Sequence, residues 1–469
     1  MDHTPSGVTQ AEVLVADIGS TLTKLSAFAG VTNPAGSHTG QAPRFLGQGV
    51  ALTTVAEGNV VLGLQQARQA LEATCAVDTT GTLLMASASA AGGLRMTVHG
   101  LTQDMTLRAA REASLGAGAI VTFTTAGLLS ADDLAEIRQR QPNLILLAGG
   151  VDYGERDVVL ANARALAALG LATPIIYAGN QAVRGEVQRL LQRAQVPVFL
   201  VDNVYPRIDE LHLEPVRRLI QDVFARHIIT APGMEQVKAM VTGNVMPTPG
   251  AVMRATELLA EILGDVLTID VGGATTDVHS VTEGSPVYAR RRVAPEPHSK
   301  RTVEGDLGVY INAAHLAAAA GEAAPAPQHV VPIPEQSVAR RMARDLTRWA
   351  VDIAVWRHAG ALRAVYGAYG RHELVEGRDL TAIRYVIGTG GALTRLEMGQ
   401  EILRHIKADP SQRKLLPPGA ARVLLDQRYI MAAAGVLSQY DPTAATTLLL
   451  ESLGLSSEDA HDGRTLRHD

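Results

Sequence analysis

One short pattern occurs twice in this sequence, and it limits the folds that the chain can adopt. Residues 13–28 consist of an apolar run that ends in Asp17, a turn containing Gly19, and a second extended run. Residues 266–281 have the same layout, with Asp270 before the glycines. A strand, a tight turn and a returning strand are typical of a β-hairpin. Two copies of one unusual hairpin indicate a duplicated fold with two related lobes.

The segment between the two hairpins has a different sequence pattern. Short apolar runs at 144–150, 174–180 and 197–203 end in glycine or polar turns, and helical patterns lie between them. Continuous apolar strands that alternate with helices predict a wound parallel sheet. The turns that follow these strands lie where wound sheets bind ligands, although such turns also simply reverse the chain. Their polar and glycine residues are Gly149, Gly150, Asn180 and Asp202.

The length of 469 residues suggests about three domains. We expect a first lobe at residues 1–117, completed by about 425–469. An inserted α/β domain is expected at 118–232, and a second lobe at 233–424. A long amphipathic helix is expected over 338–366.

Composition narrows the class of function. Hydrophobic residues make up 46% of the chain and charged residues 19%, so it can build large cores. The formal charge of −5 gives no reason to expect a nucleic-acid binder. Cys75 is the only cysteine, which excludes an intrachain disulfide and a multi-cysteine metal site. Neither a signal peptide nor a long apolar run is present, so we expect a cytoplasmic protein without membrane contact.

The hairpin turns carry groups suited to a polyphosphate. Glycine lets the backbone approach phosphate oxygens and direct N–H groups at them, and hydroxyls and a lysine add further donors. Mg²⁺ keeps several waters and takes one or two carboxylates, so Asp17 and Asp270 are expected to hold it through water. The expected phosphate-binding residues are Gly19, Ser20, Thr21, Thr23, Lys24, Gly272, Gly273, Thr275 and Thr276.

A third glycine turn lies between a strand and a helix, at Gly388, Gly390 and Gly391. It would let an adenine or a ribose lie against the backbone without a side-chain clash. One hairpin alone would be interpreted as a plain tight turn, but two matched copies and this third turn together favour a nucleotide. The usual P-loop is absent, because the sequence contains no Gly-Lys dipeptide.

These motifs resemble those of the superfamily of actin, sugar kinases and heat-shock ATPases. Residues 17–24 look like its first phosphate motif, 270–277 like its second, and 388–391 like its adenosine motif. Residues 87–93 and 432–437 look like the helices that connect its lobes. The resemblance implies an α/β fold with two duplicated actin-like (ribonuclease H-like) lobes that close over ATP and magnesium, interrupted by the inserted wound domain.

Within that superfamily the chain is most similar to the glutamate mutase accessory family, of the MutL or GlmL type. The segments that carry this similarity are 15–24, 86–96, 146–152, 176–180, 270–277 and 301–308. The resemblance implies a slow magnesium-dependent ATPase that acts on a protein client, an adenosylcobalamin-dependent mutase, as a reactivating chaperone.

The resemblance also implies individual roles. Asp17 and Asp270 would be magnesium-water ligands, and Thr21, Thr23 and Thr275 would contact the γ-phosphate. Glu304 would orient the attacking water, or else it is a solvated carboxylate of its loop. Asp277 would support Asp270 or simply end the turn.

Two other functions use the same phosphate turns. One is a small-molecule kinase or a hydantoinase-type ATP-coupled enzyme, in which the inserted domain binds the metabolite. The other is a scaffold that binds nucleotide only for stability. Phosphorylated product from a metabolite panel would indicate the kinase, and tight nucleotide binding without turnover would indicate the scaffold.

Overall fold

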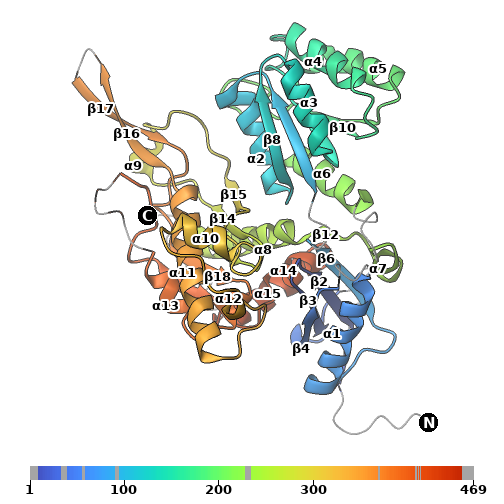
Figure 1. Cartoon of the computed structure of the whole chain (residues 1–469), viewed down its shortest axis with the longest axis vertical. Coiled ribbons are helices and arrows are strands. Elements are labelled where there is room, and N and C mark those ends of the chain that lie inside the picture. The colour runs from blue at the N-terminus through green and yellow to red at the C-terminus, as the bar shows by residue number, and fades with distance from the viewer. Residues whose placement is uncertain are drawn as a thin grey trace. The chain divides into compact units, whose positions relative to one another are not determined.

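The protein is described from a computed structural model (Figure 1), and the residues described are 9–32, 40–54, 59–89, 94–227, 234–367, 370–406, 409, 411 and 413–456. The chain forms two compact units. The first comprises Met1–Ala91, Ile229–Val293 and Arg301–Asp469, and the second comprises Gly92–Ile228 and Ala294–Lys300.

The first sheet of the first unit is built around the first predicted hairpin. Its strands are β2 (Val13–Ile18), β3 (Leu22–Ala29), β4 (Arg44–Leu52), β6 (Leu83–Ala88) and β12 (Met246–Pro247). They lie in the order β12-β6-β2-β3-β4. Strands β2, β3 and β4 are antiparallel neighbours, and β6 and β12 are added in parallel on the other side of β2.

The second sheet repeats this plan. Its strands are β13 (Val266–Val271), β14 (Thr276–Val281), β15 (Ser299–Glu304), β18 (Tyr385–Thr389) and β19 (Arg422–Leu425). They lie in the order β15-β14-β13-β18-β19. Strands β13 and β14 form the antiparallel hairpin, and β18 and β19 are added in parallel beside β13. A hairpin followed by two parallel strands thus occurs in both sheets, which confirms the duplicated fold.

Three helices form one core with the inner faces of both sheets. They are α8 (Thr248–Leu263), α14 (Met431–Leu437) and α15 (Pro442–Ser452). Val13 and Val15 of β2 and Val266 of β13 belong to this core. Helix α14 approaches α8 closely, because a Cβ placed on Gly435 would lie 1.9 Å from the carbonyl oxygen of Ala251. The small residues of α14 therefore allow two helices to fit between two sheets.

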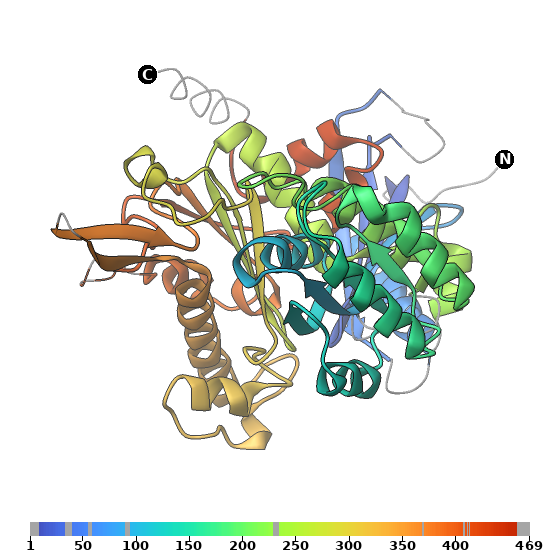
Figure 2. The ribbon, with the colours of Figure 1, turned by 90° about the horizontal axis from the view of Figure 1, so that it is seen from above.

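Other helices cover the outer faces. Helix α1 (Val60–Cys75) contacts β3 and β4, whereas α10 (Ala313–Ala319), α11 (Ser337–His358) and α13 (Gly399–Arg404) share a second core with β13 and β14. Strands β16 (Ala361–Gly367) and β17 (Gly370–Glu376) form a separate ribbon that projects from this unit (Figure 2). The shorter elements are β1 (Thr9–Gln10), β5 (Val77–Asp78), α7 (Met234–Met240), α9 (Pro286–Ala289), a 3₁₀ turn at Pro327–His329, and α12 (Gly391–Thr394).

The structure of this unit differs from the sequence prediction at two segments. The helix expected over 338–366 ends at His358, and the chain then enters β16. A connecting helix was expected at 87–93, but Ser87 and Ala88 belong to β6, and 90–93 lie outside the described residues. Residues 432–437 are helical, within α14.

The second unit contains the predicted wound parallel sheet. Its strands are β7 (Arg95–Gly100), β8 (Ile120–Ala126), β9 (Leu144–Leu147), β10 (Ile175–Tyr177) and β11 (Val198–Leu200), in the order β11-β10-β9-β7-β8. All four pairings are parallel. Helices α3 (Ala131–Arg140), α4 (Asp157–Ala168) and α5 (Arg184–Arg193) share a core with β9 and β10. A π-helix (Gln103–Leu107), α2 (Arg108–Gly116), a 3₁₀ turn (Gln181–Val183) and α6 (Glu214–His227) complete the unit.

This unit extends beyond the range 118–232 that the sequence suggested. Strand β7 precedes residue 118, and the returning segment 294–300 also belongs here. That segment is held by ion pairs: Glu296 pairs with Arg108 and, at 2.9 Å, with Lys300, whose Nζ also lies 3.4 Å from Glu112. These charges fix a chain segment that is distant in sequence.

Candidate functional site

The two hairpin turns have the same local geometry. The Gly19 N–H donates to the Leu22 carbonyl at 2.9 Å, and the Gly272 N–H donates to the Thr275 carbonyl at 2.9 Å. Asp17 lies opposite Lys24 in the first ladder, as Asp270 lies opposite Asp277 in the second. Lys24 and Asp277 are therefore equivalent positions.

The two turns meet in space. A Cβ placed on Gly273 would lie 2.6 Å from the hydroxyl oxygen of Thr21, so glycine is required where the turns approach. Within the described part of the chain, the buried Thr21 hydroxyl oxygen has no hydrogen-bond partner. A buried polar atom without a partner is costly, so this hydroxyl is available to a polar ligand.

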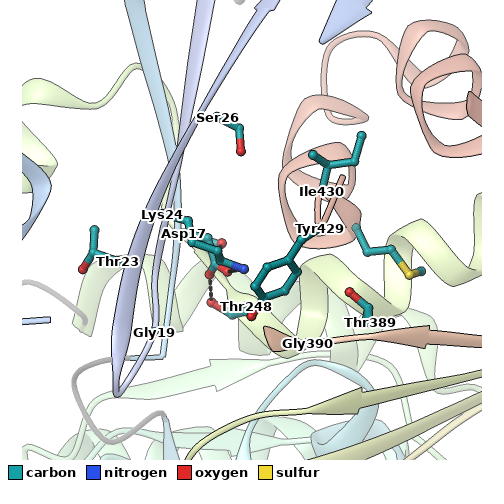
Figure 3. A network of polar contacts seen from close by, with 12 residues as sticks. Asp17, Gly19, Thr23, Lys24, Ser26, Thr248, Thr389, Gly390, Tyr429 and Ile430 are labelled. Carbon is teal, nitrogen blue, oxygen red and sulfur yellow. Dashed lines mark hydrogen bonds and ion pairs between the residues drawn. The ribbon is translucent and has the colours of Figure 1, made fainter. Parts of the chain in front are cut away.

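Asp17 is the centre of a polar cluster that Figure 3 shows from close by. Its Oδ2 lies 2.7 Å from the Lys24 Nζ, and both residues are buried, each 5% exposed. Its Oδ1 accepts from the Ser87 hydroxyl at 3.0 Å and from the Thr248 hydroxyl at 2.7 Å. Thr248 is the first residue of α8, so this carboxylate lies at the positive end of a helix dipole.

Lys24 keeps its charge in this buried place. Burial lowers its pKa, but Asp17, with smaller contributions from Tyr429 and Asp270, outweighs burial and raises the pKa above its ordinary value. The Lys24 Nζ also lies 3.3 Å from the centroid of the Tyr429 ring, and an aromatic face attracts a cation. Tyr429 and Thr248 lie outside the motifs from which the site was predicted.

Asp270 lies beside the third glycine turn. A Cβ on Gly390, whose φ is +89°, would lie 2.6 Å from the Asp270 Oδ1. Burial and the nearby charge of Asp277 raise the pKa of Asp270 to about 7, with smaller effects of Lys24, Asp17 and Asp426. The charges of the first hairpin therefore act on the acid of the second.

Asp277 pairs with a buried arginine. Its Oδ1 lies 2.8 Å from the Arg301 Nη2, and the Arg301 side chain is 1% exposed. Its Oδ2 accepts from the Thr275 hydroxyl at 3.4 Å. Arg301 thus brings a positive charge to the second hairpin, a role that the sequence analysis did not assign.

Glu304 is engaged in an ion pair. Its Oε2 lies 2.7 Å from the Arg357 Nη1 of α11, and Arg357 also contacts Asp306 at 2.8 Å. Burial raises the pKa of Glu304, although Arg357 opposes the shift, and the charge of Asp277 acts on it as well. The carboxylate therefore lies near the second hairpin, and its Oε2 accepts from an arginine.

Several expected phosphate-binding residues are not brought to this cluster. The Thr23 hydroxyl, 2.9 Å from that of Thr53, lies on the other side of β3 (Figure 3). The Thr276 hydroxyl donates to the Leu307 carbonyl in the core, and Gly388 packs among three leucines. Ser20 is exposed, and its hydroxyl donates to the Ser89 carbonyl at 3.4 Å.

The polar edge of the parallel sheet in the second unit is held by side-chain hydrogen bonds. Asn180 is buried and donates to the carbonyls of Gly154 and Glu155, and Asn203 donates to Gly150 and Asp152. These bonds fix the turns after β9 and β10. In the turn after β9 the Glu155 Oε1 accepts from the Val158 N–H at 2.8 Å, while its buried Oε2 has no hydrogen-bond partner among the described residues.

The carboxylates of the described residues do not form a preformed metal cage. No group of three or more His, Cys, Asp or Glu side chains in the described ranges is arranged to hold a metal ion. Among the described helices, none has both the length and the apolar character needed to cross a membrane.

The two like sheets and the converging turns define a two-lobed protein of the actin-like fold. Residues 13–453 match the family described as MutL protein, the glutamate mutase accessory family, and the chain belongs to that family. It is 33% identical over 466 residues to "Protein MutL" of Clostridium tetanomorphum. The matched region covers 94% of this chain and 98% of that protein.

Solved structures also resemble the chain. The diol dehydratase-reactivating factor in nucleotide-free form is 12% identical with a TM-score of 0.32, covering 94% of this chain and 99% of that chain. Xylulose kinase of Bifidobacterium adolescentis is 12% identical with a TM-score of 0.27, covering 91% of this chain and 92% of that chain.

Proposed function

We propose that this chain binds ATP with Mg²⁺ between the two hairpin turns, hydrolyses it slowly, and serves as an accessory protein of an adenosylcobalamin-dependent mutase. The observation that carries the proposal is the buried Thr21 hydroxyl, unpartnered among the described residues, at the point where the first turn approaches Gly273. A phosphate oxygen would accept from this hydroxyl.

The residues of the cluster fit a magnesium-bound triphosphate. Asp17 has both oxygens engaged by protein donors, so it would reach a metal through water, as Mg²⁺ commonly allows. Asp270 would be held ionised by the metal. The ion would supply charge neutralisation of the phosphates, while Lys24 and the glycine backbone orient them.

The family supports a protein client. Helices α8 and α14, which share a core with both sheets, would transmit a movement of one lobe to the other. To shift a two-state equilibrium from 1:99 to 99:1, nucleotide must favour one state by about 5.5 kcal/mol. Contacts made by both hairpin turns to one triphosphate are the source of this preference.

Two threonines of the first hairpin test the site. Thr21→Val removes the costly unpartnered hydroxyl, so it should raise the unfolding midpoint slightly without nucleotide and weaken ATP binding about tenfold. Thr23→Val removes the hydroxyl bonded to Thr53, so it should cost about 1 kcal/mol of stability and leave ATP binding unchanged. Calorimetric titration with Mg·ATP measures the two affinities, and thermal unfolding without nucleotide measures the two stabilities. Equal affinities of the two variants would contradict the proposed site.

Phosphate release tests the activity. The purified chain should hydrolyse ATP slowly without a metabolite, and a cobalamin-dependent mutase should accelerate it. Transfer of phosphate to a small molecule in a metabolite panel would replace this function with the kinase alternative.

A further inference from the structure

The backbone at Tyr429 adopts a strained conformation that its surroundings enforce. Its φ is +53°, in the left-handed region that a residue with a Cβ seldom occupies. The Tyr429 N–H donates to the Asp426 carbonyl at 2.8 Å, and its own carbonyl accepts from the Gln48 side chain at 3.2 Å. Strain that the surroundings hold in this way is common at functional sites.

The enforced conformation brings the Tyr429 ring to the Lys24 ammonium. The Nζ lies 3.3 Å from the ring centroid and 2.7 Å from the Asp17 Oδ2. Burial raises the pKa of the Tyr429 phenol, with Lys24 opposing, so the phenol stays neutral at physiological pH. A neutral ring presents a negative face to the cation.

The same ring also reaches the third glycine turn. Its Cε1 and hydroxyl oxygen lie 3.8 Å from the place that a Cβ on Gly391 would take. Tyr429 therefore lies between the lysine of the first hairpin and the turn expected to hold the nucleoside.

We infer that Tyr429 is a positioning residue: its ring holds the Lys24 ammonium where it meets the phosphates of a nucleotide seated on the Gly390–Gly391 turn. This inference rests on the proposed function for the identity of the ligand. The ring carries the role, so phenylalanine should replace tyrosine and leucine should not.

Selective acylation of lysines tests the contact without any nucleotide. The chain has only five lysines, at 24, 238, 300, 407 and 414, and mass spectrometry after treatment with an amine-reactive ester follows each separately. Tyr429→Leu should accelerate acylation of Lys24 about tenfold, while Tyr429→Phe stays within about twofold of the wild type. Lys300 and Lys414 should not change in either variant.

Tyr440→Leu is the matched control, because Tyr440 is a partly buried tyrosine beyond the other end of α14. It should leave Lys24 acylation unchanged. If Lys24 reacts at the wild-type rate in Tyr429→Leu, or if Tyr440→Leu accelerates it equally, the inference is overturned.

Nucleotide titration separates this inference from the proposed function. Tyr429→Leu should weaken ATP binding about tenfold but leave adenosine binding unchanged, because adenosine has no phosphate for Lys24 to meet. Absence of ATP binding in the wild type would overturn the proposed function, while the acylation result would still decide the Lys24–Tyr429 contact. Normal ATP binding by Tyr429→Leu would overturn the positioning role alone.

Discussion

Lys24 and Asp277 occupy equivalent positions in the two hairpins, yet they carry opposite charges. Lys24 neutralises Asp17 across its own hairpin, whereas Asp277 takes its cation, Arg301, from β15. Asp270 therefore faces a second carboxylate where Asp17 faces an ammonium. The duplicated site is electrostatically asymmetric, and its least favourable place for a negative charge is at Asp270.

This asymmetry predicts a pH dependence of stability in the absence of metal. Burial and Asp277 raise the pKa of Asp270 to about 7, whereas in the unfolded chain it loses its proton near pH 4. Between those values the native state holds the extra proton, so stability falls as pH rises through this window. Asp270→Asn removes the titrating group. Its thermal midpoint should exceed that of the wild type at about pH 8, and the difference should shrink steadily as the pH falls and vanish only near about pH 4.

Glu261→Gln, at an exposed acid on α8, serves as the control and should follow the wild type at both pH values. A constant difference between Asp270→Asn and the wild type across this range would show that Asp270 does not titrate there.

At the scale of elements, the turn that precedes α14 connects the site to the core. The Asp426 carboxylate accepts from the Thr389 hydroxyl at 2.9 Å and from the Ser452 hydroxyl at 2.5 Å. It also accepts from the backbone N–H groups of Ile430 and Met431, at the start of α14. One buried carboxylate thus joins β18, α14 and α15, and it fixes the turn that presents Tyr429.

Asp426→Asn should destabilise the first unit by about 2–4 kcal/mol, because an amide nitrogen cannot accept from the donors that surround it. Ser452→Ala removes one of the four donors and should cost about 1 kcal/mol. Urea unfolding measures both values. A loss in Asp426→Asn no larger than that in Ser452→Ala would contradict the central role of this carboxylate.

The elements that could be predicted are those whose signals are local. The hairpins follow from an apolar run, an acid and a glycine turn, and β9, β10 and β11 follow from continuous apolar runs. Strand β7 was not predicted, because its sequence, with Arg95, Thr97 and His99, does not resemble a buried strand. Its polar side chains are satisfied within the unit: His99 lies 2.8 Å from the Thr125 hydroxyl and 2.9 Å from that of Thr97.

The candidate site shows the same division. Strand alternation, which the sequence contains, places Thr23 and Lys24 on opposite faces, so only one of them can share the side of Asp17. Tyr429 could not be predicted in this way. Its role depends on an uncommon backbone conformation and on a partner far away in the sequence, and no local pattern encodes either.

At the scale of the whole molecule, the two units have separate hydrophobic cores. The cores around α8 and α11 lie within the first unit, and the core around β9 and β10 lies within the second. Every residue assigned to the candidate site belongs to the first unit. The only two tryptophans, Trp349 and Trp356, also lie there, in α11. Tryptophan fluorescence therefore reports the unfolding of the unit that contains the site.

Mg·ATP should stabilise the first unit selectively. At a free concentration about 100 times Kd, it should add about 2.7 kcal/mol to the unfolding free energy that tryptophan fluorescence reports. Amide hydrogen exchange in β9 and β10 of the second unit should not slow, because a ligand protects only the cooperative unit whose unfolding removes its site. Thr21→Val should reduce the fluorescence shift at the same ATP concentration. Equal protection of β9 and β10 would show that the two units unfold together. Nucleotide binding would then stabilise the entire chain, which would contradict this prediction.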